Sequence, residues 1–266
     1  MTSIDICFII DATGSMADAI NGVKQHIQDI VTGIRRQYDD TICIRTAVSA
    51  YRDYPLNENS TDHETLDFTT DIERFKCFLD RLSAEGGLDE AEDVMTGLEQ
   101  AARLNWASAS RLIVHIADAP CHGRMYHGHL HIGDDYPNGD KYGRTSKHLF
   151  QTLKNVCGVN SFKFIHLNST TKPMVAIWKT EQTEQTEQTG ANNWITEDDL
   201  EGIYDNTLTE TIVTASMNTI TRDRRMFDAM RTGMYGDIRS DIRSDIRDRP
   251  NRFDDTARNS PRSMFS

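Results

Sequence analysis

The feature that most constrains the fold is an alternation of buried-strand patterns with amphipathic-helix patterns along the first two thirds of the chain. Ile4–Ile10 is a nearly unbroken apolar run, which is typical of a strand covered on both faces. The next segment, 16–34, places Met, Ile and Val residues three or four positions apart, as the buried stripe of a helix does. Strands that alternate with helices predict a mostly parallel sheet with helices on both faces, so the expected fold class is a three-layer α/β fold.

Later segments continue this alternation. Strands are expected at 42–51, at 66–68 on a sheet edge, at 112–117 and at 162–167, and helices at 70–82, 94–102, 146–156, 174–178 and 208–230. The helix from 70 is expected to open with a capping box, in which Thr70 is the N-cap residue and Glu73 lies three positions later. Its predicted buried face consists of Ile72, Phe75, Leu79 and Leu82.

The composition changes after residue 180. We expect the α/β domain at 1–180, a polar loop of EQT triplets at 181–193, a partly helical extension at 194–232 and a low-order tail rich in Arg and Asp at 233–266. Within the tail, 237–248 (DIRSDIRSDIRD) repeats every four residues. This repeat fits either a helix with Asp–Arg pairs or a disordered segment of alternating charge.

The charge balance limits the partners that the chain attracts. There are 29 Lys and Arg against 41 Asp and Glu, a net charge of -12, which gives no long-range support for nucleic-acid or acidic-membrane binding. No apolar run is long enough for a membrane helix, and the N-terminus does not resemble a secretory signal. The five cysteines form no CxxC pair, which favours a reducing compartment, the cytoplasm or the nucleus.

Polar residues follow the first strand and a later one at the point where each strand ends. Asp11, Thr13 and Ser15 alternate in a turn that contains Gly14, and Asp118 follows the strand at 112–117. Because ligands of such folds bind at the carboxyl ends of the strands, these oxygens are expected to converge. They suit Mg²⁺, Mn²⁺ or Ca²⁺. The alternative is that a hydroxyl only caps the following helix while Asp11 interacts favourably with the helix dipole.

Several motifs, in this order, give the sequence a specific resemblance. The turn Asp11-x-Thr13-x-Ser15-Met16 resembles the metal-ion-dependent adhesion site of von Willebrand factor type A (VWA) domains. The similarity continues through YRDY at 51–54, GGLDEAEDV at 86–94, HIADAPCHG at 115–123, YH at 126–127 and YPNGD at 136–140. As a set, these motifs resemble the VWA domains associated with alpha-type protein kinases, over about residues 3 to 180.

This resemblance implies a Mg²⁺ site that uses Asp11, Thr13, Ser15 and Asp118 and binds an acidic side chain of a protein partner through an open position of the metal. The family usually adds a threonine from a middle loop, and here the pattern departs from it. The comparable position is nearest to Asp89, with Glu92 and Thr96 as alternatives. An additional carboxylate there would weaken the attraction of the cation for an anionic partner.

The loop at 120–144 offers a second type of metal ligand. Its Cys121, His122 and His127 could bind Zn²⁺, together with nearby histidines and aspartates, although the spacing matches no closed zinc site. A polar packed lid over the cation is the alternative. Asp53 is expected to form an internal ion pair with the neighbouring Arg52.

The expected function is therefore a non-enzymatic, metal-dependent protein-interaction module, an intracellular scaffold or regulatory protein. No Walker loop or kinase catalytic loop is present, and the residues after 180 are too few for a kinase domain. One alternative is a metal-dependent hydrolase, or its regulatory subunit, with Asp53 or a loop histidine as base. Another is a VWA domain in which the metal only stabilises the fold.

Overall fold

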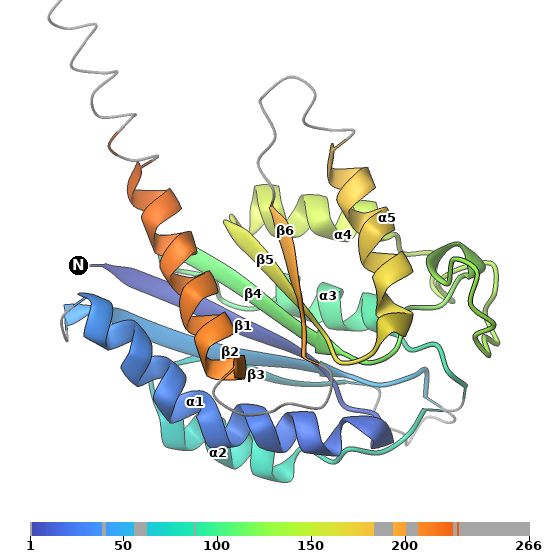
Figure 1. Ribbon diagram of the computed structural model, residues 1–266, viewed down its shortest axis with the longest axis horizontal. Coiled ribbons are helices and arrows are strands. Elements are labelled where there is room, and N and C mark those ends of the chain that lie inside the picture. Colours follow the sequence, from blue (N-terminus) through green and yellow to red (C-terminus); the bar gives the residue numbers. More distant parts are fainter. Residues whose placement is uncertain are drawn as a thin grey trace, which may run out of the picture. The chain divides into compact units, whose positions relative to one another are not determined.

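A six-stranded sheet forms the centre of the fold in the computed structural model (Figure 1). The structure describes residues 2–38, 41–55, 63–87, 89–183, 194–200, 207–225 and 228. In chain order the elements are β1 (Ser3–Asp11), α1 (Ala17–Tyr38), β2 (Cys43–Tyr51), β3 (His63–Thr69), α2 (Ile72–Arg81), α3 (Val94–Ala102), β4 (Ser110–Ala117), α4 (Ser146–Gln151), β5 (Ser161–His166), α5 (Lys172–Thr183) and β6 (Ile195–Asp199). Residues 207–225 are also helical. The contacts divide the chain into two units, Met1–Asp223 and Arg224–Ser266.

The strand order places the ends of β1 and β4 next to each other. The order is β3-β2-β1-β4-β5-β6, in which β3 pairs antiparallel with β2 and the other pairings are parallel. Asp11 lies opposite Tyr51 of β2, and Ile10 lies opposite Ile116 of β4. The loops that follow β1, β2 and β4 therefore leave the sheet at the same edge, where ligands of parallel sheets bind.

The two faces of the sheet bury two separate cores. Successive side chains of a strand point to opposite faces. Accordingly, Ile6 and Phe8 of β1 pack in one core with α1, α2 and the helix at 207–225, whereas Cys7 and Ile9 pack in the other with α3, α4 and α5. Helices on both faces of a mostly parallel sheet confirm the predicted three-layer α/β fold.

The start of α2 differs from the predicted capping box. The N-cap residue is Asp71, whose Oδ1 accepts a hydrogen bond from the backbone nitrogen of Arg74 at 3.1 Å. The prediction of Thr70 was therefore wrong by one position. Both residues are common N-caps, and the choice depends on where the strand before the helix ends. Phe75 and Leu79 are buried as predicted.

The folded domain continues beyond the expected boundary at residue 180. Helix α5 includes the first EQT triplet, and β6 adds a sixth strand that pairs with β5. The rest of the EQT repeat and the tail at 233–266 lie outside the described residues.

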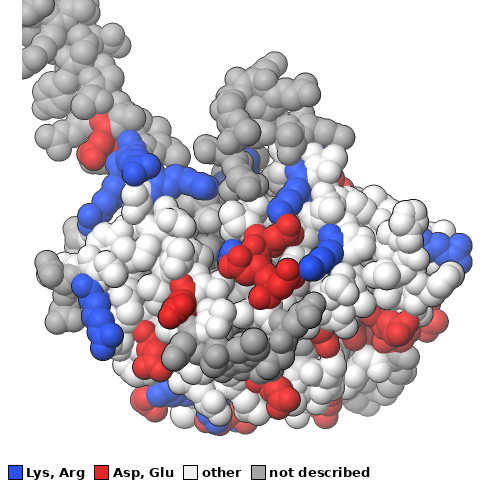
Figure 2. Space-filling view, viewed as in Figure 1, with Lys and Arg blue, Asp and Glu red and all other residues white. Residues whose placement is uncertain are grey.

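Three acidic residues of β6 each pair with a lysine: Glu197 with Lys179, Asp198 with Lys163 and Asp199 with Lys172. Figure 2 shows this acidic group with basic side chains beside it. Charged residues on an edge strand disfavour pairing with another chain.

A buried histidine adds a polar group to the core. His115 is buried, with its Nε2 2.9 Å from the Tyr51 hydroxyl, and burial lowers its pKa to about 3. It is thus a hydrogen-bonded core histidine. All five cysteines are free thiols. Among the described residues, no helix has both the length and the apolar character that crossing a membrane requires.

We expect Gly97→Ala to destabilise the protein by about 1–3 kcal/mol, although alanine favours helices. A Cβ atom at this position of α3 would overlap the Tyr51 ring and lie 3.1 Å from Cγ2 of Ile9. Urea unfolding would measure the change. Gln100→Ala in the same helix is the control, and an equal loss in both variants would contradict the close-packing argument.

Candidate metal centre

The turn between β1 and α1 carries the predicted motif of acid and hydroxyl side chains. Asp11 is fully buried, and its Oδ1 accepts hydrogen bonds from the backbone nitrogen and the hydroxyl of Thr13, at 2.9 and 2.7 Å. Gly14–Met16 form one 3-10 turn, in which Ser15 is exposed. Thr13 thus orients the carboxylate of Asp11 from within the same turn, and Ser15 remains accessible.

Three carboxylates at this edge of the sheet each have a buried oxygen with no hydrogen-bond partner among the described residues. These atoms are Asp11 Oδ2, Glu92 Oε2 and Asp118 Oδ1. An unsatisfied buried polar atom costs roughly 1–3 kcal/mol, and more when it is charged. Ordered water or an ion is the usual partner of such an atom. The donor set therefore fits a hard cation with oxygen ligands.

The pKa values show that these carboxylates interact. Burial and, second, the charge of Asp118 together raise the pKa of Asp11 to about 7. Burial, followed by the charges of Asp11 and three other carboxylates, raises the pKa of Glu92 to about 10. Each carboxylate makes its neighbours harder to ionise, because like charges repel in a buried site. A divalent cation would remove this penalty.

The middle loop between α2 and α3 is fixed to all three strand ends. Its backbone nitrogens donate to carbonyl oxygens that follow these strands: Glu85 to Ala12 after β1, Asp93 to Arg52 after β2 and Glu92 to Pro120 after β4, at 3.0, 3.2 and 3.0 Å. Glu92 also forms an isolated parallel bridge with Cys121. These contacts bring Glu92 to the same edge as the β1 turn, although about 80 residues separate them in the sequence.

The three alternatives for the middle-loop ligand have different surroundings. Both carboxylate oxygens of Asp89 accept hydrogen bonds from backbone nitrogens, at 3.0 and 2.5 Å. The Thr96 hydroxyl donates to Asp93 and accepts from Arg144, both at 2.6 Å. Glu92, by contrast, is the alternative with a buried oxygen that lacks a partner among the described residues.

A second cluster of side chains lies around His122. Its Nε2 is 2.9 Å from Oδ1 of Asp53, and its Nδ1 is 2.9 Å from Oδ1 of Asp134. Burial alone would lower the pKa of His122, but these hydrogen bonds outweigh burial and raise it. The ring of Tyr54 stacks on the imidazole, with centroids 4.7 Å apart. Within the described part of the chain, Asp53, Asp89 and His122 form a group whose ligand atoms all lie within 4.8 Å of one another.

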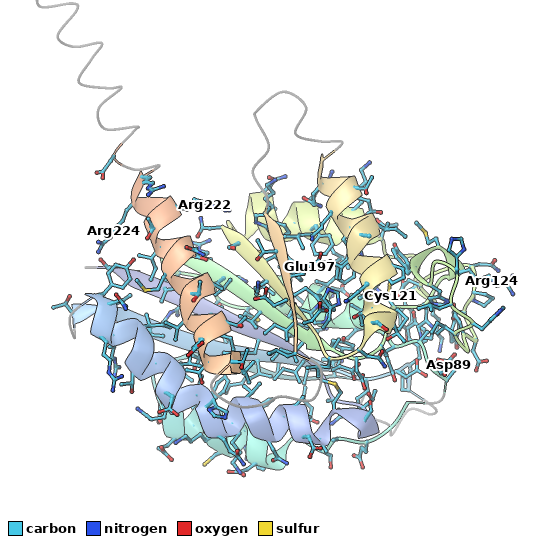
Figure 3. The ribbon with its side chains drawn as sticks, in the orientation of Figure 1. Asp89, Cys121, Arg124, Glu197, Arg222 and Arg224 are labelled. Atoms are coloured by element: carbon cyan, nitrogen blue, oxygen red, sulfur yellow. The ribbon has the colours of Figure 1, made fainter. Side chains whose placement is uncertain are left out.

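The expected zinc ligands Cys121, His122 and His127 do not form a group of this kind among the described residues. Nε2 of His127 is 3.1 Å from the backbone oxygen of Cys121 and 3.7 Å from Oδ2 of Asp134. The thiol of Cys121 is buried, and burial raises its pKa well above the ordinary value. Figure 3 shows Cys121 and Asp89 at the same end of the sheet, with Arg124 directed away from it.

The expected ion pair between Arg52 and Asp53 is not the one found. Nη2 of Arg52 donates to Glu64 at 2.9 Å and to the backbone oxygen of Ser83 at 2.5 Å. Asp53 instead contacts His122. Both residues lie in the loop after β2, where Arg52 contacts the segment that follows α2 and Asp53 contacts the loop that follows β4.

Asp134 was not among the residues that the sequence marked as candidates for the site. Asp134 lies 12 positions after His122, and its Oδ2 also accepts a hydrogen bond from the backbone nitrogen of Gly123 at 2.9 Å. No local pattern marks this contact, because the loop between the two residues has no regular period. The available signal was only the density of His and Asp residues in the loop.

Comparisons with known proteins agree with this fold and motif. Residues 5–129 match the sequence model of the von Willebrand factor A domain. This stretch of the chain therefore matches the family that its motifs resemble. It is also similar to alpha-protein kinase vwkA of Dictyostelium discoideum, with 31% identity over 167 residues, which cover 62% of this chain and 25% of the kinase. The similarity thus spans about a quarter of that relative.

Two solved structures are similar to the chain at low sequence identity. A von Willebrand factor type A structure from Catenulispora acidiphila shares 14% identity and covers 82% of this chain and 43% of its own, with a TM-score of 0.45. The conserved hypothetical protein BatB from Bacteroides thetaiotaomicron shares 12% identity and covers 84% of this chain and 100% of its own, with a TM-score of 0.49.

Proposed function

We propose that this chain is a metal-ion-dependent protein-interaction module. Asp11, Thr13, Ser15 and Asp118 would hold the cation, Mg²⁺ or a similar hard divalent ion. The observation that carries this proposal is the set of buried carboxylate oxygens without a partner among the described residues. Carboxylate and hydroxyl oxygens are the ligands that Mg²⁺, Mn²⁺ and Ca²⁺ prefer.

Glu92 is the middle-loop ligand in this proposal, in place of the Asp89 that spacing favoured. Glu92 as a residue is 4% exposed, and its backbone nitrogen donates to the loop that follows β4. Three ionised carboxylates around a divalent cation would leave a net negative charge. The open position of the metal would then attract an acidic partner side chain less strongly than a site with two carboxylates does.

The bound cation would supply an open coordination position for an oxygen of a partner protein, and the exposed Ser15 lies in the same turn. The alternative of a hydrolase with His122 as general base is less well supported, because both ring nitrogens of His122 contact carboxylates.

The similarity to the kinase relative covers about a quarter of that protein, so we do not extend its kinase activity to this chain. Five free cysteines support a location in the cytoplasm or nucleus, where thiols stay reduced.

Capture of partner proteins from a lysate should depend on the cation. We expect immobilised protein to retain partners in Mg²⁺ and to lose at least about nine tenths of them in EDTA or on Asp11→Ala, because removing a ligand weakens metal affinity strongly. Quantitative mass spectrometry of the retained proteins would measure this loss.

Asp18→Ala is the matched control, since Asp18 is an exposed carboxylate in the first turn of α1. It should retain the same partners as the wild type. Equal retention in Mg²⁺, in EDTA and by Asp11→Ala would contradict a metal-bridged interaction. A loss of thermal stability in EDTA without a loss of partners would favour a structural cation instead.

A further inference from the structure

The cluster of Asp53, Asp89 and His122 draws its members from three loops at the carboxyl edge of the sheet. Asp53 follows β2, Asp89 lies in the middle loop, and His122 follows β4. Asp53 is 7% exposed and His122 is 2% exposed, whereas Asp89 is half-buried. The cluster thus has two buried members and one that borders solvent, which provides a path for a small ion.

The three side chains are oriented before any ion binds. Asp53 Oδ1 accepts a hydrogen bond from the backbone nitrogen of Tyr54 at 2.6 Å. Asp89 accepts two backbone hydrogen bonds, one of them from the far loop at Asp135. Such contacts fix the carboxylates at little further loss of side-chain entropy, which favours binding of an ion.

The surroundings of His122 match those of a metal-binding histidine. Its Nδ1 contacts the carboxylate of Asp134, while its Nε2 is directed at Asp53 in the cluster. A histidine that binds a metal through one ring nitrogen usually donates the other N–H to a carboxylate, which fixes the tautomer and the ring orientation. Stacking on Tyr54 fixes the plane of the ring as well.

We propose that Asp53, Asp89 and His122 form a second cation site that binds Zn²⁺ or another divalent ion of similar softness. One imidazole and two carboxylates suit such an ion better than Mg²⁺. Two metal–ligand bonds of about 2.1 Å can join atoms up to about 4.2 Å apart. The ligand atoms lie within 4.8 Å of one another, so side-chain movements of less than about 1 Å close the site. Asp134 is the positioning residue behind His122.

Zinc titration in the presence of excess Mg²⁺ tests this site without relying on the function proposed above. The metal-free full chain should bind one equivalent of Zn²⁺ in competition with a chromophoric chelator. We expect His122→Gln and Asp89→Asn each to weaken this binding at least about 100-fold, and Asp134→Asn to weaken it about 10- to 100-fold. Co²⁺ in place of Zn²⁺ should give visible absorption bands that change in the Asp134→Asn variant.

Two matched controls separate this site from its neighbours. His127→Gln removes the nearby histidine that faces the Cys121 backbone oxygen, and Asp11→Asn removes a ligand of the hard-cation site. Both should bind Zn²⁺ within about twofold of the wild type. Circular dichroism would check that each variant folds. If His122→Gln fails to fold, the Asp89→Asn variant still tests the site.

Three results would overturn the proposal. The first is a wild type that binds no stoichiometric Zn²⁺. The second is a folded Asp89→Asn variant with unchanged affinity, in which case His122 serves only as an ion-pair partner of Asp53 and Asp134. The third is an equal loss in His127→Gln, which would place the ion on Cys121 and His127. Loss of partner capture in Asp11→Ala with unchanged Zn²⁺ binding would show that the two sites are separate.

Discussion

Glu92→Gln should change the stability of the protein in opposite directions without and with Mg²⁺. In EDTA at neutral pH, we expect the variant to be more stable by about 1–3 kcal/mol, because a neutral amide avoids the penalty that burial and nearby carboxylates impose on Glu92. In saturating Mg²⁺, the wild type should gain about 2.7 kcal/mol when the ion is at 100 times its Kd. The variant should gain far less, since it lacks a ligand. Urea unfolding under both conditions would measure these changes.

The same carboxylates predict how stability depends on pH. The folded protein has pKa values of about 7 for Asp11 and about 10 for Glu92, above the ordinary values of 3.8 and 4.5. The folded state therefore keeps protons that the unfolded state releases. In EDTA, stability should fall as the pH rises from about 5 to 7, by up to about 1.4 kcal/mol per pH unit for each group. Glu92→Gln should reduce this slope, and Mg²⁺ should remove most of it.

Glu73→Gln is the matched control for both experiments, because Glu73 is an exposed glutamate of α2 with 77% of its side chain accessible. It should change the free energy of unfolding by less than about 0.5 kcal/mol under every condition. A Glu92→Gln variant that is less stable in EDTA, or that keeps the full gain from Mg²⁺, would show that Glu92 has a satisfied structural role.

The strands and helices of the two cores could be predicted because their apolar patterns are strong. β1 and β4 are covered on both faces, and their sequences are nearly continuous apolar runs. The buried residues of α1 form one apolar stripe along the helix. β6 was missed, because its sequence ITEDD has one buried residue and three acidic ones. Its position depends on pairing with β5 and on lysines from other elements, which no local pattern reports.

The candidate site was predictable where it depends on strand ends and not where it depends on loops. Asp11 and Asp118 follow strands whose positions the pattern gives, so the rule for parallel sheets places them together. The choice among Asp89, Glu92 and Thr96 depends on backbone hydrogen bonds between the middle loop and three other segments. Such contacts join residues that are far apart in the sequence, and one sequence alone contains no signal for them.

Asp5→Ala should destabilise the protein by about 3–5 kcal/mol, since removal of one partner of a buried ion pair leaves the other groups unsatisfied. Asp5 is fully buried in β1. Its carboxylate accepts hydrogen bonds from Nε and Nη2 of Arg45 at 2.8 and 2.6 Å, from the backbone nitrogens of Ala107 and Ser108 at 2.8 and 3.0 Å, and from the Ser108 hydroxyl at 2.6 Å. Chemical unfolding would measure the loss, and Mg²⁺ should not restore it.

The pH dependence of this loss distinguishes an ionised Asp5 from a neutral one. Burial alone would raise the pKa of Asp5, but hydrogen bonds from Arg45 and Ser108 outweigh burial and lower it. Its stabilising effect is therefore present above the ordinary pKa of 3.8 and is lost as the pH falls through the folded value. The deficit of Asp5→Ala should stay constant from about pH 8 to pH 5 and shrink only below about pH 4.

The control for Asp5→Ala is Asp29→Ala in α1, where the carboxylate is 69% exposed and 3.9 Å from Nδ1 of His26. Solvent and salt screen such a pair, so its loss should cost less than about 0.5 kcal/mol. Equal losses in the two variants would mean that the contacts of Asp5 add no net stability. A deficit of Asp5→Ala that grows as the pH falls from 8 to 6 would instead show that burial outweighs the hydrogen bonds and raises the pKa of Asp5.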